Sequence, residues 1–352
     1  MLLQLLERLD PRFKPHVISL KTLGDLAPRI QALGIPVEAM STELGARGPL
    51  ALIRLAVRLR SLGPDIVHTW MYRADLIGGL AARLAGVPCV IWSIRHGNLD
   101  RDKNARSTLA VVWLCAWLSR WAPTRILSNS EQARRTHIAR GYMPEKMVVL
   151  PNGFDLSAFR PDASARDAVR AELGLEPGTP LVGWIGRHHP QKNVEGFFEA
   201  AAILHRRLPQ VHFLLAGEGL KGVGLEGVTH ALGVRNDIPR LMAALDVLAS
   251  SSSGEAFSNV IGEAMACGVP CVVTDVGDSA HIVGDTGRVV PPSDVPALAA
   301  AMEDLLRMPQ LERAALGARA RKRIADHFEI AAIVKQYEAL YDELCSRTPL
   351  LS

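Results

Sequence analysis

The chain has 352 residues, of which 48% are hydrophobic and 22% charged, a composition that fits two folded domains and excludes a disordered protein. No apolar run reaches the roughly 18–20 residues of a membrane-spanning helix. The longest run, LAVVWLCAWL at 109–118, predicts a buried helix instead. We expect a cytoplasmic protein, because no secretory signal is recognisable. Zinc-type spacing is absent, so buried, reduced thiols are expected at Cys89, Cys115, Cys267, Cys271 and Cys345.

The net charge of +4 is divided unevenly along the chain. Residues 1–150 hold 21 Lys and Arg against 11 Asp and Glu, an excess of +10, whereas the remaining residues carry −6. A basic first half beside an acidic second half suggests that the first half meets an anionic partner. The alternative is an ordinary solvated surface rich in arginine and lysine.

In the first half, short apolar runs alternate with helical patterns. MLLQLLERLDP at the start predicts a helix, and strands are expected at 16–20, 65–70, 89–97 and 125–130. Helical patterns occupy 49–63 and 74–86, and the second ends at Gly86, a residue suited to a helix C-terminus. Continuous apolar strands separated by helices predict a parallel sheet that is covered on both faces.

Residues 149–162, VLPNGFDLSAFRPD, contain two prolines and an Asn-Gly turn signal, and they predict a linker. The alternation then resumes, with strands expected at 181–187, 211–219, 228–233, 247–252 and 270–277. We therefore expect two doubly wound α/β domains, residues 1–153 and 154–328. A C-terminal helix at 329–352 is expected to pack back towards the first domain. Ligands of such sheets bind at the carboxyl ends of the strands, here in the cleft between two domains.

Cations and glycines follow the expected strands of the second domain. Arg187 and Lys192 lie in GRHHPQKN, before a helix, and two cations beside a helix N-terminus suit a polyphosphate. Gly186 lets the chain turn, and Gly217 and Gly219 permit close approach of a ligand after the next strand. Neither G-x-G-x-x-G nor a P-loop motif occurs, which disfavours dinucleotide and P-loop sites.

The stretch GEAFSNVIGEAMACGVPCVVTD, residues 254–275, places two carboxylates around the start of a short helix. A helix that begins at about Ser258 turns its free N–H groups towards the strand ends, where they can bind a diphosphate. Glu263, one turn along, can accept hydrogen bonds from the two hydroxyls of a ribose. Glu255, ahead of the helix, can accept those of a sugar. The two acids therefore bracket a nucleotide diphosphate sugar and do not form a general acid–base pair.

With these motifs the chain resembles the retaining GT-B glycosyltransferases of family 4 along nearly its whole length. The resemblance rests on the E-x7-E spacing, on GxR and KN upstream of it, and on NSEQARR, VLPNGFD, AGEG, LGVRND and GRVVPPSD in the same order. It implies two Rossmann-like domains that face a cleft. It also implies a metal-independent enzyme without a cofactor, and no Asp-x-Asp metal motif contradicts this.

The resemblance also implies roles for single residues. Arg187 and Lys192 would contact the donor diphosphate, and Glu263 would bind the ribose. The residues expected at the donor sugar are Glu255, Phe257, Ser258 and Asn259, of which the last two also face the diphosphate.

Four further residues outside that stretch are candidates for the site. Val234 and Arg235, in LGVRND, are candidates beside the base. His96, in SIRHGN, matches a strand-end histidine near the transferred sugar, and with Glu255 it completes the expected catalytic pair. His68, at the end of DIVHTW, is a candidate for lining the acceptor cleft.

One departure from the family pattern concerns the N-terminus. The family opens with a strand and a glycine-rich loop, whereas this chain starts at what resembles the helix after that loop. We therefore expect the first domain to lack its first strand and glycine loop. A truncated, inactive protein that only binds a sugar nucleotide is one alternative. A sugar-nucleotide epimerase of the same architecture is the other, although the two acids argue against it.

The function expected is transfer of a sugar, with retention, from a nucleotide diphosphate sugar to a glycan, lipid-linked or small-molecule acceptor, as in cell-envelope polysaccharide biosynthesis. UDP is the expected base, and no nucleic acid partner is expected.

The basic first domain raises a question about where the acceptor is met. Arg54, Arg58 and Arg60 lie close together on the helix expected at 49–63, and Trp113, Trp117 and Trp121 are spaced four apart further on. Tryptophans at that spacing suit a membrane–water interface or a protein core. We expect peripheral contact with the anionic inner face of the membrane, against the alternative of a soluble acceptor.

Overall fold

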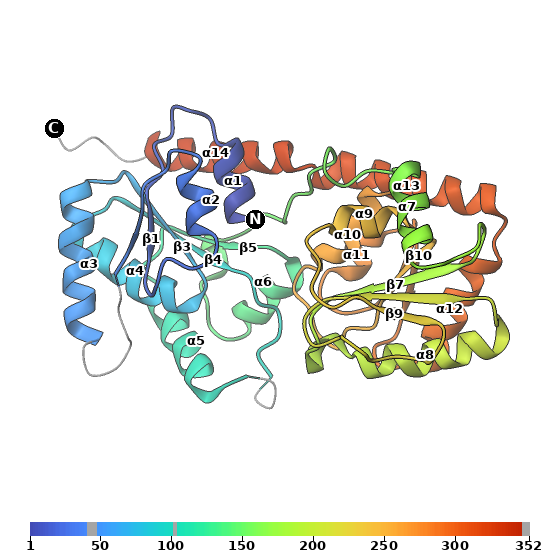
Figure 1. Cartoon of the computed structure of the whole chain (residues 1–352). Coiled ribbons are helices and arrows are strands. Elements are labelled where there is room, and N and C mark those ends of the chain that lie inside the picture. Colours follow the sequence, from blue (N-terminus) through green and yellow to red (C-terminus); the bar gives the residue numbers. More distant parts are fainter. Residues whose placement is uncertain (41–47, 101–103, 347–352) are drawn as a thin grey trace. The chain divides into compact units, whose positions relative to one another are not determined.

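The computed structural model describes residues 1–40, 48–100 and 104–346 (Figure 1). The chain divides into two compact units, Met1–Gly153 with Ile330–Ser352, and Phe154–Glu329. The last residues of the expected C-terminal helix, 347–352, lie outside the described residues. Each unit has its own sheet and its own core.

The first unit is built on a parallel sheet in the order β3-β4-β5-β6, formed by Ile66–Trp70, Cys89–Ile94, Arg125–Ser128 and Met147–Val149. Its helices are α1 Leu2–Arg8, α2 Ala27–Gln31, α3 Gly48–Leu62, α4 Tyr72–Ala85, α5 Arg106–Leu118, α6 Glu131–Ile138 and α14 Ile330–Ser346. A 3₁₀ turn, Pro144–Lys146, precedes β6. The C-cap of α4 is Gly86 in the left-handed conformation, as the sequence predicted.

Two short strands of this unit stand apart from that sheet. β1, Val17–Ser19, and β2, Val37–Ala39, pair in parallel with each other. Within the described residues, neither strand hydrogen-bonds to β3–β6. Where we expected one sheet lacking a strand, the unit has two separate sheets.

Strand β4 shows how the sheet of the first unit is covered. All of its residues are buried, because it lies between two neighbouring strands and under helices on both faces. Val90, Trp92 and Ile94 pack against residues of α3, α4 and α5. Cys89 and Ile91 pack on the other face against α14. Residues 330–346 therefore complete the core of the first unit (Figure 1).

The second unit has a six-stranded parallel sheet in the order β12-β11-β10-β7-β8-β9. The strands, from β7 to β12, are Leu181–Ile185, His212–Ala216, Thr229–Ala231, Val247–Ser250, Cys271–Thr274 and Arg288–Val290. The helices, from α7 to α13, are Ala163–Glu172, Val194–Arg207, Ile238–Ala243, Asn259–Ala266, Ser279–Val283, Val295–Arg307 and Gln310–Phe328, and Pro190–Lys192 is a 3₁₀ turn. One face of the sheet packs on α8 and α12, the other on α9, α10 and α13.

The parallel sheets and the longer strands confirm the sequence predictions, and three details differ. β2, β6 and β12 were not predicted, since each has only three residues and lies at the end of its sheet. The expectation of a buried helix at 109–118 is wrong for one face, where Trp113 and Trp117 are exposed. Cys345 is exposed, near the end of α14, whereas the other four cysteines are buried as expected.

Candidate active site

The candidate site lies where the strand order of the second unit reverses. From β7 the chain builds outward through β8 and β9, and it then returns to add β10, β11 and β12 on the other side of β7. Loops that leave β7 and β10 therefore diverge at one point on the carboxyl edge of the sheet. Ligands of doubly wound sheets bind at this kind of switch point.

An ion pair joins these two loops. Lys192, at the end of the 3₁₀ turn after β7, donates from Nζ to Oε1 of Glu255, which follows β10, at 2.5 Å. Ser252 donates its hydroxyl to the same oxygen at 2.8 Å. Both charged side chains are largely covered, with 25% and 12% of their surface exposed. A cation and a carboxylate are thus held together at the switch point.

The helix α10 begins at this place with its N-terminus uncapped. Ser258 is its N-cap residue, but its hydroxyl is 2% exposed and has no hydrogen-bond partner among the described residues. A buried hydroxyl without a partner costs free energy. Together with the backbone N–H groups of the first helical turn, which the Ser258 side chain does not cap, it makes a donor-rich helix N-terminus that suits an anion.

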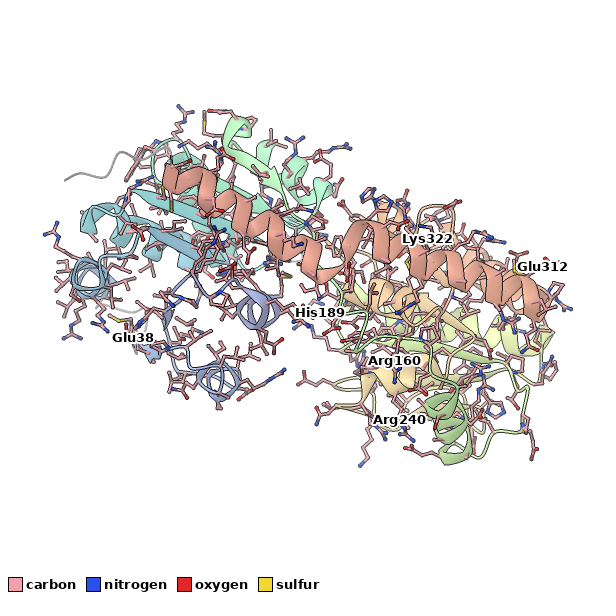
Figure 2. The ribbon with its side chains drawn as sticks, turned by 90° about the horizontal axis from the view of Figure 1, so that it is seen from above. Glu38, Arg160, His189, Arg240, Glu312 and Lys322 are labelled. Atoms are coloured by element: carbon pink, nitrogen blue, oxygen red, sulfur yellow. The ribbon has the colours of Figure 1, made fainter. Side chains whose placement is uncertain are left out.

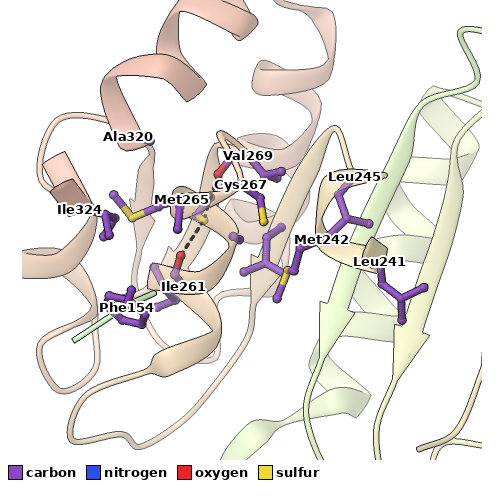
Figure 3. Packing of buried hydrophobic residues seen from close by; sticks show 14 of the residues in the cluster. Phe154, Leu241, Met242, Leu245, Ile261, Met265, Cys267, Val269, Ala320 and Ile324 are labelled. Atoms are coloured by element: carbon purple, nitrogen blue, oxygen red, sulfur yellow. Dashed lines mark hydrogen bonds between the residues drawn. The ribbon is translucent and has the colours of Figure 1, made fainter. Parts of the chain in front are cut away.

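The packing of α10 into the core of the second unit fixes the orientation of this helix. Ile261 and Met265 pack into the core beside Ala320 and Ile324 of α13 (Figure 3). A Cβ on Gly262 would lie 2.0 Å from the ring of Phe154, so a glycine is needed there for close contact. The predicted donor-sugar residue Phe257 turns its own ring into this core, stacked on Phe154, which leaves its backbone for a ligand.

The remaining predicted residues of this site differ in exposure. Glu263 is partly buried in α10, and burial raises the pKa of its carboxyl to about 7. Arg187 and Asn259 are exposed, and the structure records no ion pair for Arg187 among the described residues. Every group expected at the diphosphate and the ribose thus belongs to the loop after β7 or to α10 and its approach, and their roles stay predictions.

The glycines after β8 allow close contact with the loop after β7. Gly217 has φ +146°, and a Cβ on it would lie 1.9 Å from the carbonyl oxygen of Gly186. Gly219 has φ +77°, and its Cβ would lie 2.9 Å from that of His188. The loops after β7 and β8 are therefore packed closely against each other, and the close approach of a ligand to Gly186, Gly217 and Gly219 stays a prediction.

The two residues expected to contact the nucleotide base, Val234 and Arg235, differ in exposure and in their bonds. Val234 is 71% exposed. Arg235 is held by Asp237 through two bonds of 2.8 Å and by Glu172 at 3.1 Å, and Glu172 also pairs with Arg240. The hydrogen bonds from Arg235 lower the pKa of the Asp237 carboxyl. The guanidinium of Arg235 is thus engaged within the protein, and contact of either residue with a base stays a prediction.

In the first unit, His96 follows β4 and is partly buried. Its Nε2 lies 3.1 Å from Oδ1 of Asn104. The amide nitrogen of Asn104 donates to the carbonyls of Asn98 and Asp100, so Oδ1 accepts and the His96 Nε2 carries the proton. Within the described residues no hydrogen bond to the other ring nitrogen, Nδ1, is recorded. This geometry is compatible with the predicted role of His96 and does not test it.

His68 lies in a network that ties the sheet to α14. Its Nδ1 lies 2.9 Å from the hydroxyl of Tyr341, and its Nε2 lies 2.7 Å from that of Ser93. Burial, with Arg95 nearby, lowers the pKa of His68 to about 3, so the ring is neutral. With both nitrogens engaged, these contacts favour a structural role, and a place in the acceptor cleft stays a prediction.

Sequence reasoning missed the residues that hold the site in place. Ser251 donates to the carbonyls of Lys192 and Asn193 at 3.0 and 2.8 Å, and it accepts from the indole of Trp184 at 3.0 Å. Arg321 of α13 donates to the carbonyl of Ala266 at the end of α10. No motif marked these contacts, because their partners lie tens of residues away in the chain.

Residues 1–40, 48–100 and 104–346 contain no group of three or more His, Cys, Asp or Glu side chains placed to hold a metal ion. None of the helices in these ranges is both long and apolar enough to span a bilayer.

Two family profiles match the chain. The profile described as Glycosyltransferase Family 4 matches residues 1–158, and the one described as Glycosyl transferases group 1 matches residues 179–308. Between them they take in most of both units.

Several curated proteins are similar in sequence. The UDP-Gal:alpha-D-GlcNAc-diphosphoundecaprenol alpha-1,3-galactosyltransferase of Escherichia coli is 32% identical over 66% of this chain and 63% of its own length. The D-inositol 3-phosphate glycosyltransferase of Segniliparus rotundus is 33% identical over 63% and 53%. The chain thus spans less than two thirds of these relatives. The lipopolysaccharide core biosynthesis mannosyltransferase LpsB of Rhizobium meliloti is 28% identical over 95% and 97%.

Solved structures share the fold. Anabaena Alr3699/HepE, crystallised with UDP and glucose, superposes with a TM-score of 0.83 at 24% identity, covering 97% of this chain and 95% of its own. The sucrose-phosphate synthase of Thermosynechococcus elongatus gives 0.75 at 20% identity, covering 95% and 99%. At these identities the likeness concerns the fold alone.

Proposed function

Because the chain belongs to the GT-B glycosyltransferases of family 4, we propose that it moves a sugar from a nucleotide diphosphate sugar to an acceptor hydroxyl with retention. The observation that carries the proposal is the switch-point site. There Lys192, Glu255 and the uncapped start of α10 lie together, with Glu263 one turn along. A diphosphate needs cations and free donors, and a sugar and a ribose need acceptors for their hydroxyls.

We propose the donor and the acceptor from the substrates in the names of the relatives. UDP is the proposed nucleotide of the donor. It is supported by the UDP-galactose donor in the name of the E. coli relative and by the UDP in the crystals of Alr3699/HepE. A lipid-linked glycan is the proposed acceptor, since the E. coli relative is named for one. The reaction would then take place in the cytoplasm, at the inner face of the membrane, in the synthesis of a cell-envelope glycan.

In the proposed reaction the acceptor oxygen bonds to the anomeric carbon as the bond from that carbon to the phosphate oxygen breaks. The electron pair leaves with the diphosphate, which takes the proton of the acceptor hydroxyl. Attack from the same face as departure gives retention. Lys192, Arg187 and the N-terminus of α10 would stabilise the charge on the leaving group, so no metal ion is needed. Glu255 would orient the donor sugar, and His96 would lie near the transferred sugar.

The experiment that tests the proposal separates the two ends of the donor. Glu263→Ala should weaken binding of free UDP, because the ribose hydroxyls lose their acceptor. Glu255→Ala should leave UDP binding nearly intact and reduce turnover of the UDP-sugar. Calorimetry with UDP and a turnover assay with lipid-linked acceptors measure the two effects. Equal loss of UDP binding in both variants would refute the assignment.

A pH dependence of nucleotide binding follows from the raised pKa of Glu263, which is about 7. Hydrogen bonds from a ribose favour the carboxylate, so binding releases a proton below that value. The affinity for UDP should therefore fall as the pH drops below 7, by up to about tenfold per pH unit. Glu263→Gln should retain only the titration of the nucleotide itself. Parallel pH profiles for the two proteins would show that Glu263 does not meet the ribose.

A further inference from the structure

Three helices of the first unit expose apolar side chains on their outer faces. On α5 and just beyond it, Trp113, Trp117 and Trp121 are 71%, 57% and 50% exposed. The opposite side of the helix, with Val112, Cys115 and Leu118, packs into the core. The alternative left open by the sequence, that the tryptophans are core residues, is therefore wrong. Two exposed tryptophans one turn apart on α5, with a third exposed in the turn after it, form an apolar surface that calls for a partner.

The neighbouring helices extend this patch. α4 contacts α3 on one side and α5 on the other. Leu84 of α4 is exposed, and Ile53 and Val57 expose more than half of their surface on α3. We define the docking layer as the outer faces of α3, α4 and α5 together with the turn after α5, which carries Arg120 and Trp121.

The charges of the docking layer have one sign. The three helices contain six arginines and a single acid, Asp75. Asp75 is buried and accepts from the hydroxyl of Thr69 at 2.6 Å, and burial raises the pKa of its carboxyl to about 7. Exposed arginines, Arg106 and Arg120, stand at the two ends of the tryptophan face. The charged side chains that these three helices expose are therefore all arginines, beside exposed apolar side chains.

Not every arginine of the layer is available to a partner. Arg58 donates from Nε to both carboxylate oxygens of Glu38 at 3.0 and 3.1 Å. Glu38 itself is labelled in Figure 2. Arg60 donates to the carbonyl of Leu84 at 3.2 Å. The cations that best mark the layer are therefore Arg54, Arg106 and Arg120, in place of the cluster of Arg54, Arg58 and Arg60 that the sequence suggested.

We propose that the docking layer binds the surface of an anionic lipid bilayer, with the three tryptophans at the level of the headgroups. Indole rings favour that depth because their apolar body and polar N–H find matching surroundings there. The arginines would lie against anionic headgroups, to which each basic residue adds attraction. The proposal rests on the proposed function for its purpose, since a lipid-linked acceptor is met at a membrane, and on the surface alone for its evidence.

The test is flotation with vesicles of phosphatidylcholine, with and without phosphatidylglycerol, using the whole chain. The protein should float with the anionic vesicles at low salt and be released by high salt. Trp113→Ser/Trp117→Ser/Trp121→Ser should abolish flotation, and Arg106→Ala/Arg120→Ala should weaken partitioning by roughly fivefold per arginine. Brominated lipids should quench the fluorescence of the wild type more than that of the tryptophan variant.

Matched controls lie on the second unit. Leu311→Ser removes a side chain that is 85% exposed on α13, and Arg319→Ala removes an exposed arginine of the same helix. Both should float like the wild type. No flotation with anionic vesicles, or flotation unchanged in the tryptophan variant, would overturn the proposal. So would a concentration-dependent dimer that the tryptophan variant abolishes without any lipid binding.

Calorimetry with UDP on the same preparations keeps the two proposals apart. Loss of flotation with unchanged UDP binding in the tryptophan variant is expected if both hold. A wild type that binds UDP and never floats would leave the proposed function standing without the docking layer. A wild type that floats and does not bind UDP would leave the docking layer standing without the proposed function.

Discussion

Lys192→Ala should lower turnover of the sugar donor by roughly 10²–10³-fold, or about 2–4 kcal/mol of transition-state stabilisation. The reason is the position of its ammonium group. It lies at the switch point of the sheet, largely covered, and it is held 2.5 Å from Glu255. In a partly dry site a fixed cation stabilises the charge that develops on a departing diphosphate more than it would in water.

The size of the loss in turnover depends on how Glu255 is left in the Lys192→Ala variant. Glu255 would retain the hydroxyl of Ser252 and lose its charged partner. A carboxylate near the leaving diphosphate would then repel it without compensation. Steady-state kinetics with a UDP-sugar and acceptor measure the loss, which should appear in kcat as well as in kcat/KM. Lys335→Ala, which removes an exposed lysine of α14, is the control and should behave like the wild type. Unchanged donor turnover in Lys192→Ala would rule out the diphosphate assignment.

The sequence predicted the parts of this fold that depend on local pattern. The apolar runs of β4, β7, β8 and β10 are continuous because each strand is covered on both faces, and this made them recognisable. Three of the five three-residue strands described, β2, β6 and β12, were missed, since so few residues leave little pattern to detect.

The candidate site was predictable in its residue types and less so in its contacts. Lys192 and Glu255 were identified separately, but their ion pair spans 63 positions of the chain and exists only because β7 and β10 are adjacent. The supporting bonds of Ser251 have the same origin. For the tryptophans of α5, spacing alone left two opposite orientations open, and the packing of the opposite face decided between them. Tertiary neighbours, which no local pattern contains, explain each of these cases.

Gly217→Ala should destabilise the second unit by about 3–5 kcal/mol, which combines backbone strain with a steric clash. Its φ of +146° is unfavourable for any residue with a Cβ. The new methyl group would also lie 1.9 Å from the carbonyl oxygen of Gly186 and 2.5 Å from its carbonyl carbon. These are backbone atoms between two paired strands, so they cannot move aside as the tip of a side chain could.

A second glycine separates the two contributions. Gly222 also has positive φ, +74°, but a Cβ on it would have nothing within 4 Å. Gly222→Ala should therefore cost only the backbone term, about 1–2 kcal/mol. Chemical denaturation followed by circular dichroism measures both variants. The difference of roughly 2 kcal/mol or more reports the clash with Gly186. If Gly217→Ala unfolds no more easily than Gly222→Ala, the loops after β7 and β8 are not held at this distance.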